Sequence, residues 1–155
     1  MDTSARPSDL SKDRLRVWLR LLKVTRMVEA DLRERMRVRW DMTLPRFDVM
    51  AALRRNEDGL KMSDLSGVLR VSNGNVTGIV DRLVTDGLVE RRAVEGDRRA
   101  NRVVLTETGR ALFDEMAVVH ELWVDEMLSP VGPQGLETLR SRLGRIIDKL
   151  EEKDT

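Results

Sequence analysis

Apolar residues recur at intervals of three and four over most of the chain, which is the spacing of one face of an amphipathic helix. The pattern predicts five helices, several of which begin or end at Pro, Gly or Asn. Their expected positions are 11–40, a helix opened by Thr43–Pro45 and ended by 56–59, 73–86, one from 107 that is broken at Pro130, and a last one ending near 152.

After Asp86-Gly87 the periodicity changes from that of a helix to that of short strands. Gly is the usual residue just past a helix end, and two β-branched runs follow at Leu88–Arg92 and Arg102–Leu105. Such runs predict a two-stranded hairpin with its loop at 93–101. The fold class expected from the whole pattern is therefore mainly α with a small β wing.

The helix at 73–86 has two different faces. Ser72 is its expected N-cap, and the face expected to be buried consists of Val76, Ile79, Val80 and Leu83. The opposite face begins with the uncharged polar side chains of Asn73, Asn75 and Thr77. Because asparagine can pair bidentately with adenine in the major groove, this face is a candidate for reading DNA bases. The alternative is an ordinary surface helix that Gly74 and Gly78 weaken.

Arginine dominates the predicted hairpin. From Arg91 to Arg102 there are five arginines and two acids. The enhanced negative potential of a narrow minor groove attracts arginine, so Arg98 and Arg99 are candidates for that contact. Asp97 could orient one of the two guanidinium groups by an ion pair. The alternative is an ordinary solvated hairpin.

Several short motifs in this region resemble those of one protein family. They are Met62-Ser-Asp-Leu65 with Val71-Ser72, Val76-Thr77-Gly-Ile-Val-Asp-Arg82-Leu83, Gly87-Leu-Val-Glu-Arg91, Asp97-Arg98-Arg99 and Val104-Leu105-Thr106-Glu-Thr-Gly109. Residues 60–109 thereby resemble the winged helix-turn-helix core of the MarR family of transcriptional regulators. Family members often have Thr where this chain has Lys61. Because lysine cannot cap a helix, we expect Ser63 or a water to serve there.

The resemblance implies a domain organisation and a function. The chain would be a single domain, 1–155, whose lobe 43–106 binds DNA through a helix-turn-helix at about 61–86 and a wing at 88–105. The segments 11–40 and 107–152 would dimerise. The expected function is that of a regulator, commonly a repressor. Its expected DNA contacts are Asn73, Asn75 and Thr77 to bases, Ser72 and Arg82 to phosphates or as local support, and Arg98 or Arg99 in the minor groove.

The last predicted helix has the seam of a paired helix. Its apolar positions follow a spacing of 3, 4, 3, 4, and they are Leu136, Leu139, Leu143, Ile146 and Leu150. Such a heptad-like seam favours helix pairing, and we expect it to pair with the first helix of a second copy. The alternative is packing on its own domain. In a homodimer two heads can meet the half-sites of a pseudo-palindromic double-stranded DNA about one helical turn apart.

Composition excludes several other classes of function. The 155 residues, 41% of them hydrophobic, fit one domain with a core. The chain has no cysteine, and His120 is its only histidine, which excludes thiolate sites and multi-histidine metal sites. We find no catalytic motif, so we expect that the protein is not an enzyme. We also expect no catalytic residue, metal or cofactor. No apolar run has the length of a membrane span and no signal peptide is evident, so we expect a cytoplasmic protein without a membrane partner.

The net charge of +1 is unevenly distributed. Residues 1–106 carry +6 and residues 107–155 carry −5. The basic part contains the predicted DNA-binding lobe, as a phosphate partner requires. Part of the excess lies on the first helix, however, in Arg33, Arg35, Arg37 and Arg39. Four arginines on a short span could pair with several phosphates of a ligand, and the alternative is a solvated helix without a ligand role.

The resemblance also implies control by a small anionic or aromatic molecule, bound where the dimer-forming helices meet the DNA-binding lobe. The expected lining is Trp18, Leu22, Arg33, Arg37, Arg46, Phe47, Met50, Met116 and His120, although the apolar members could equally be core. The segments Arg16–Lys23, Thr43–Asp48 and Val71–Thr77 are similar to a branch of the family that responds to coenzyme A thioesters of aromatic acids. An aromatic acyl-coenzyme A is therefore the expected effector. The alternative effector is a free aromatic carboxylate held by one arginine. The alternative function is that of a winged-helix protein-interaction module without DNA binding.

Overall fold

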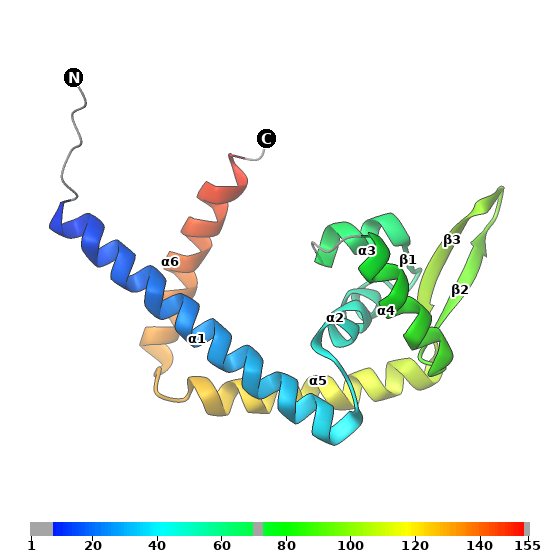
Figure 1. The fold of residues 1–155 in the computed structure, drawn as a ribbon, viewed down its shortest axis with the longest axis horizontal. Helices are drawn as coiled ribbons and strands as arrows, with labels where there is room; N and C mark the ends of the chain where they lie inside the picture. Colours follow the sequence, from blue (N-terminus) through cyan, green and yellow to red (C-terminus); the bar gives the residue numbers. More distant parts are fainter. Residues whose placement is uncertain (1–7, 70–72, 154–155) are drawn as a thin grey trace. The chain divides into compact units, whose positions relative to one another are not determined.

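The computed structural model describes residues 8–69 and 73–153, without the side chains of 68–69, 73–74 and 97–100 (Figure 1). This part of the chain is mainly helical with one small antiparallel sheet, which confirms the predicted fold class. Its elements are α1 (Asp9–Trp40), α2 (Leu44–Arg55), β1 (Leu60–Lys61), α3 (Met62–Leu69), α4 (Asn73–Thr85), β2 (Val89–Val94), β3 (Asp97–Leu105), α5 (Glu107–Leu128) and α6 (Pro133–Glu151).

Threonine side chains cap two helices where the sequence predicted their start. The Thr43 hydroxyl accepts a hydrogen bond from the backbone N–H of Arg46 at 3.3 Å, in the first turn of α2. The Thr106 hydroxyl accepts one from the backbone N–H of Gly109 at 3.0 Å, in the first turn of α5. Each hydroxyl satisfies one of the backbone donors that a helix start leaves without a partner.

The start of α3 has a side-chain contact that the sequence analysis did not predict. A carboxylate oxygen of Asp64 accepts a hydrogen bond from the backbone N–H of Lys61 at 3.1 Å. This is the returning half of a capping box, in which the third helical side chain reaches back to the residue before the helix. Asp64 therefore satisfies the backbone donor of Lys61, while the expectation that Ser63 or a water caps the first turn stays a prediction.

The hairpin has longer strands than predicted. Strand β2 pairs with β3 in antiparallel register from Val89↔Leu105 to Ala93↔Asn101. The loop expected at 93–101 is therefore mostly strand, and the chain reverses at Glu95-Gly96, where Gly96 has a φ of 84°. The predicted contacts Asp97, Arg98 and Arg99 thus belong to β3 instead of a loop. A third strand, β1, pairs with β3 at Leu60↔Val103 and was not predicted, because two residues are too short for a periodic signal.

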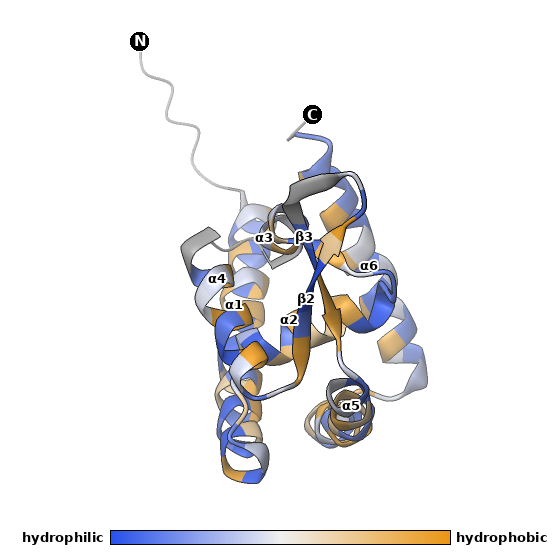
Figure 2. Cartoon of the chain, turned by 90° about the vertical axis from the view of Figure 1, so that its right-hand side faces the viewer, coloured by the Kyte–Doolittle hydropathy of each residue, from blue (hydrophilic) through white to orange (hydrophobic). Residues whose placement is uncertain are grey.

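The described residues fall into two compact units that divide between His120 and Glu121. The core of the first unit lies among α2, α3, α4, the first part of α5 and the base of the hairpin. Figure 2 shows hydrophobic colour where β2 and β3 meet the helices. The completely buried side chains of this unit include Met36, Val49, Met50, Leu65, Val76, Val80, Leu83, Val103 and Met116. The burial of three residues from α4 fixes which face of that helix points outward.

The second unit contains α6, whose apolar residues are uncovered. No residue of this helix, which is described throughout, is buried. Its exposed large apolar side chains are Leu136, Leu139, Leu143, Ile146, Ile147 and Leu150. Among the described helices of the chain, none is both long enough and apolar enough to cross a lipid bilayer.

The end of α4, the start of β2 and the start of α5 meet at Leu88. The backbone N–H of Leu88 donates to the carbonyl of Leu83 at 2.9 Å, and the Leu88 carbonyl accepts from the backbone N–H of Thr106 at 3.0 Å. A Cβ atom at Gly109 would lie 1.9 Å from that same carbonyl oxygen. The close approach of α5 to Leu88 therefore requires glycine at position 109.

We predict that Gly109→Ala destabilises the protein, because backbone and not a flexible side chain blocks the added methyl group. The free energy of unfolding in urea should fall by roughly 1–3 kcal/mol. Gly67→Ala is the control, since a Cβ atom there meets nothing within 4 Å. It should be neutral or stabilise α3 by up to about 1 kcal/mol. Equal effects of the two substitutions would show that the Leu88 contact does not restrict position 109.

Candidate functional site

Helix α4 presents an uncharged polar surface to solvent. Asn75, Thr77 and Gly78 are exposed, whereas Val76 and Val80 on the same helix are completely buried. This orientation is the one expected for the predicted base-reading face. Of the remaining predicted DNA contacts, Ser72 lies outside the described residues. The side chains of Asn73, Asp97, Arg98 and Arg99 are also outside the described part of the structure.

The wing is joined to the body of the first unit by its basal arginines. Arg91 of β2 forms an ion pair with Asp81 of α4. Arg102 of β3 donates to the backbone carbonyl of Gly59 at 3.0 Å. Arg91 and Arg102 therefore have structural partners at the base of the wing. The count of five arginines in the sequence could not identify which of them have such a structural role.

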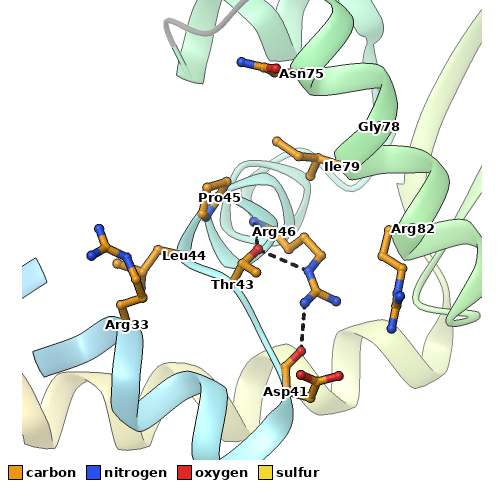
Figure 3. A pocket seen from close by; sticks show the side chains of 10 residues that line it. All are labelled: Arg33, Asp41, Thr43, Leu44, Pro45, Arg46, Asn75, Gly78, Ile79 and Arg82. Carbon is orange, nitrogen blue, oxygen red and sulfur yellow. Dashed lines mark hydrogen bonds between the residues drawn. The ribbon is translucent and has the colours of Figure 1, made fainter. Parts of the chain in front are cut away.

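A cavity of about 780 Å³ lies between α4 and the junction of α1 with α2. Its size is within the range of small-molecule sites. Figure 3 shows its lining, which consists of Arg33, Asp41, Thr43, Leu44, Pro45, Arg46, Asn75, Gly78, Ile79 and Arg82. Two predicted effector residues, Arg33 and Arg46, thus line the same cavity as two predicted DNA-binding residues, Asn75 and Arg82. The sequence analysis treated these as separate sites.

Arg46 is the most enclosed cation of the cavity, with 11% of its side chain exposed. Its Nη2 donates to the backbone carbonyl of Asp41 at 2.8 Å, and its Nε donates to the Thr43 hydroxyl at 3.1 Å. Its Nη1 lies 3.4 Å from a carboxylate oxygen of Asp86. The guanidinium group therefore contacts the end of α1, the start of α2 and the end of α4 at once.

The three arginines of the cavity lie in two places. Figure 3 shows the guanidinium groups of Arg46 and Arg82 on one side of Thr43, and Arg33 on the other side beside Leu44. Apolar atoms of Leu44, Pro45 and Ile79 also line the cavity. A ligand with an apolar body and anionic groups at both ends would match this distribution of charge.

The other predicted effector residues lie elsewhere. Phe47, Met50 and Met116 belong to the buried core, Trp18 is 55% exposed on α1, and Leu22 is half-buried. Arg37 donates to both carboxylate oxygens of Glu34, at 3.0 and 2.7 Å. None of these residues lines the described cavity, and neither does His120. The effector lining expected from the sequence therefore stays a prediction, of which Arg33 and Arg46 line this cavity.

His120 of α5 belongs to a stack of rings between α5 and α2. The ring of Phe47 stacks on Phe113 at a centroid distance of 5.3 Å and on His120 at 4.9 Å. Burial lowers the pKa of His120, while the nearby Asp48 carboxylate opposes this effect. Burial raises the pKa of Asp48, an effect that His120 opposes and Glu29 reinforces. His120 is therefore held mainly as a neutral ring in a packing role.

Residues 8–69 and 73–153 contain no cluster of three or more His, Asp or Glu side chains that could hold a metal ion. The chemistry offered by the described site is that of hydrogen bonding and ion pairing. Its exposed amide and hydroxyl groups suit contacts to nucleic-acid bases, and its guanidinium groups suit anionic groups.

Known proteins similar to the chain share this architecture. The sequence model of the MarR family matches residues 40–100. The uncharacterized HTH-type transcriptional regulator YfiV of Bacillus subtilis is 32% identical over 148 residues, which are 93% of this chain and 91% of that protein. The crystal structure of a MarR family transcriptional regulator from Silicibacter pomeroyi is 34% identical, with a TM-score of 0.76 over 92% of this chain and 99% of that one. A mutant MarR from Escherichia coli in complex with operator DNA is 26% identical, with a TM-score of 0.75 over 90% and 99% of the two chains.

The lowered pKa of His120 predicts a pH dependence of stability. Below the usual histidine pKa of 6.5 the unfolded chain takes up a proton that the folded chain binds less tightly. The stability contributed by neutral His120 should therefore be present above pH 6.5 and be lost as the pH falls below it. Urea unfolding at pH 7.5, 6.5 and 5.5 and at one protein concentration would measure this loss.

Two variants distinguish His120 from other titrating groups. His120→Phe, which keeps a ring against Phe47, should reduce the loss of stability between pH 7.5 and 5.5. Asp48→Asn should enlarge it, because the charge that favours protonated His120 is removed. An unchanged pH dependence in both variants would contradict the assignment.

Proposed function

Because the chain belongs to the MarR family of transcriptional regulators, we propose that it is a homodimeric repressor that binds a pseudo-palindromic DNA site and leaves it when a small aromatic ligand binds. The family membership itself confirms the prediction that the chain is not an enzyme. The DNA site, the dimer and the ligand are argued separately below.

The exposed polar face of α4 beside a two-stranded wing supports the DNA site. In this proposal Asn73, Asn75 and Thr77 contact base edges in the major groove. Ser72 and Arg82 contact phosphates, and Arg98 or Arg99 of the wing enters the minor groove, oriented by Asp97. The similar MarR of Escherichia coli, which was solved with operator DNA, also supports a DNA-binding role.

Uncovered apolar side chains support the homodimer. The row of leucine and isoleucine on α6 is exposed along the whole helix. Helix α1 likewise exposes the apolar side chains of Leu15, Val17, Trp18, Leu19, Val24 and Met27. Exposed apolar surface of this extent is typical of an interface. We propose that these two helices cover each other between two copies of the chain.

The position of the cavity carries the proposal of ligand control. Asn75, Gly78 and Arg82 line the cavity and also belong to the helix that is proposed to read DNA. A ligand that fills the cavity must therefore contact that helix directly. Differential contact with two positions of α4 is what a ligand needs in order to change the affinity for DNA.

The arrangement of the arginines favours an aromatic acyl-coenzyme A as this ligand. Its aromatic acyl group would lie on Leu44, Pro45 and Ile79, and its phosphates would meet Arg33 or Arg46. Bidentate pairing with phosphate is a common role of arginine. The alternative ligand is a free aromatic carboxylate that Arg46 or Arg82 holds alone.

Asn75→Ala tests the DNA site. We expect the affinity for the operator to fall by roughly 1–3 kcal/mol and the preference at one base pair to relax, while binding to random DNA is unchanged. Fluorescence anisotropy with DNA from upstream of the protein's own gene, and with scrambled DNA, measures both. Thr85→Ala is the control, because its hydroxyl bonds the Asp81 carbonyl within the same helix. Equal losses for operator and scrambled DNA would refute base reading by Asn75. If the unchanged protein bound promoter DNA no more tightly than scrambled DNA, the result would favour the protein-interaction module.

Arg33→Ala tests the ligand. It should weaken benzoyl-coenzyme A binding by about tenfold, the loss of one charge-assisted contact, and leave benzoate binding unchanged. Arg37→Ala is a matched control on the same helix, because Arg37 pairs with Glu34 outside the cavity. Isothermal titration calorimetry gives both affinities. Equal losses for the thioester and the free acid, or no loss for either, would contradict the assignment of phosphates to Arg33.

A further inference from the structure

The carboxylate of Asp86 already occupies the arginine pair of the cavity. One of its oxygens lies 3.1 Å from Nε of Arg82 and 3.4 Å from Nη1 of Arg46. Asp86 follows the last residue of α4, and its backbone N–H donates to the Arg82 carbonyl at 3.0 Å. The protein therefore supplies its own anion to two cations that face the cavity.

Asp86 connects α4 to the junction of α1 and α2 through Arg46. On its other side Arg46 is held by the Asp41 carbonyl and the Thr43 hydroxyl. A long ion pair thus joins the end of α4 to this junction, in addition to the direct packing of α4 against α2. Arg46 has 11% of its side chain exposed and Asp86 has 30%. At 3.4 Å the pair is longer than a strong charge-assisted hydrogen bond, so another anion can replace the Asp86 carboxylate.

From this geometry we propose that Asp86 is the element through which the ligand releases DNA. An anionic group that enters the cavity takes the place of the Asp86 carboxylate on Arg46 and Arg82. Two carboxylates cannot share these guanidinium groups without repulsion, so Asp86 moves away and the ion pair that joins the end of α4 to Arg46 of α2 is lost. The proposal rests on the proposed function, since it names the step by which a ligand in this cavity acts on the reading helix.

The rest of α4 determines how far the helix can move. Val76, Val80 and Leu83 remain completely buried, so the ligand does not unfold the helix. The residue after Asp86 is Gly87, with a φ of 71° and no atom within 4 Å of a Cβ position. This glycine allows the end of the helix to change direction at little cost. A small shift of α4 relative to the wing then changes how both meet DNA.

The variant that tests the proposal is Asp86→Asn, which removes the charge and keeps the shape. Its matched control is Asp81→Asn, which makes the same change on the same helix but in the pair with Arg91, away from the cavity. Benzoate and benzoyl-coenzyme A are the probes. Calorimetry gives their affinities, anisotropy gives operator affinity with and without saturating probe, and thermal unfolding reports that each variant is folded.

Asp86→Asn should bind at least one probe about 5- to 10-fold more tightly than the unchanged protein, because the competing anion is gone. Without a probe it should bind operator more weakly, since the link from α4 to Arg46 is lost. The ratio of operator affinities without and with probe should fall towards one. Asp81→Asn should leave probe affinity and this ratio unchanged.

Unchanged probe affinity in Asp86→Asn, or an unchanged release ratio, would overturn the role of Asp86 while leaving a ligand-controlled repressor in place. Failure of both probes to bind either protein would overturn both the Asp86 step and the ligand, but operator binding would still support a DNA-binding regulator. A gain in probe affinity of equal size in Asp81→Asn would show that the effect is general electrostatics and would also overturn the proposal.

Discussion

The backbone of Leu88 is the point on which the arrangement of α4, the hairpin and α5 depends. Its N–H closes the end of α4, and its carbonyl receives the first backbone donor after β3. The Thr106 hydroxyl, which caps α5, also donates to the Gly87 carbonyl at 2.7 Å. Three elements that differ in direction are thereby joined within a few residues. Because backbone hydrogen bonds have narrow geometry, these bonds fix the angle between α4 and the β2–β3 hairpin.

Helix α4 is held by two different kinds of interaction, apolar packing along one face and an ion pair just past its last residue. Towards the core its residues are completely buried, and such packing resists displacement because interiors are close-packed. Towards the cavity, the Asp86 carboxylate that follows α4 lies 3.4 Å from Arg46. A pair of this length is weaker than a short charge-assisted hydrogen bond. The lobe therefore combines a firm attachment of the helix with a weak one that faces the space open to a ligand.

The arginine excess of α1 has more than one physical meaning. Arg35 pairs with Asp31 at 2.7 Å, Arg37 pairs with Glu34, and Arg39 lies over the ring of Trp40 at 4.8 Å. Arg33 is the member of the series that lines the cavity. Neighbours on the helix surface thus neutralise much of the charge that the sequence counts as excess, as pairs three or four residues apart commonly do.

Local rules of the chain determined most of the elements of this protein. Period and capping residues located the helices, with Thr43 and Thr106 as caps, and β-branched runs located the hairpin, because these signals act within a few residues. The outward face of Asn75 and Thr77 followed from the same period. The local signals did not predict the two-residue strand β1 or the capping role of Asp64.

Only the tertiary structure decided which residues form the cavity. Arg33, Arg46 and Arg82 come from three helices, and neither their spacing nor their charge indicates that they line one space. Met50 and Met116 have the same helical signal as a lining residue would have, yet they fill the core. The physical reason is that periodicity describes one element at a time. Whether an apolar face meets a neighbour or leaves a gap depends on how separate elements pack against one another.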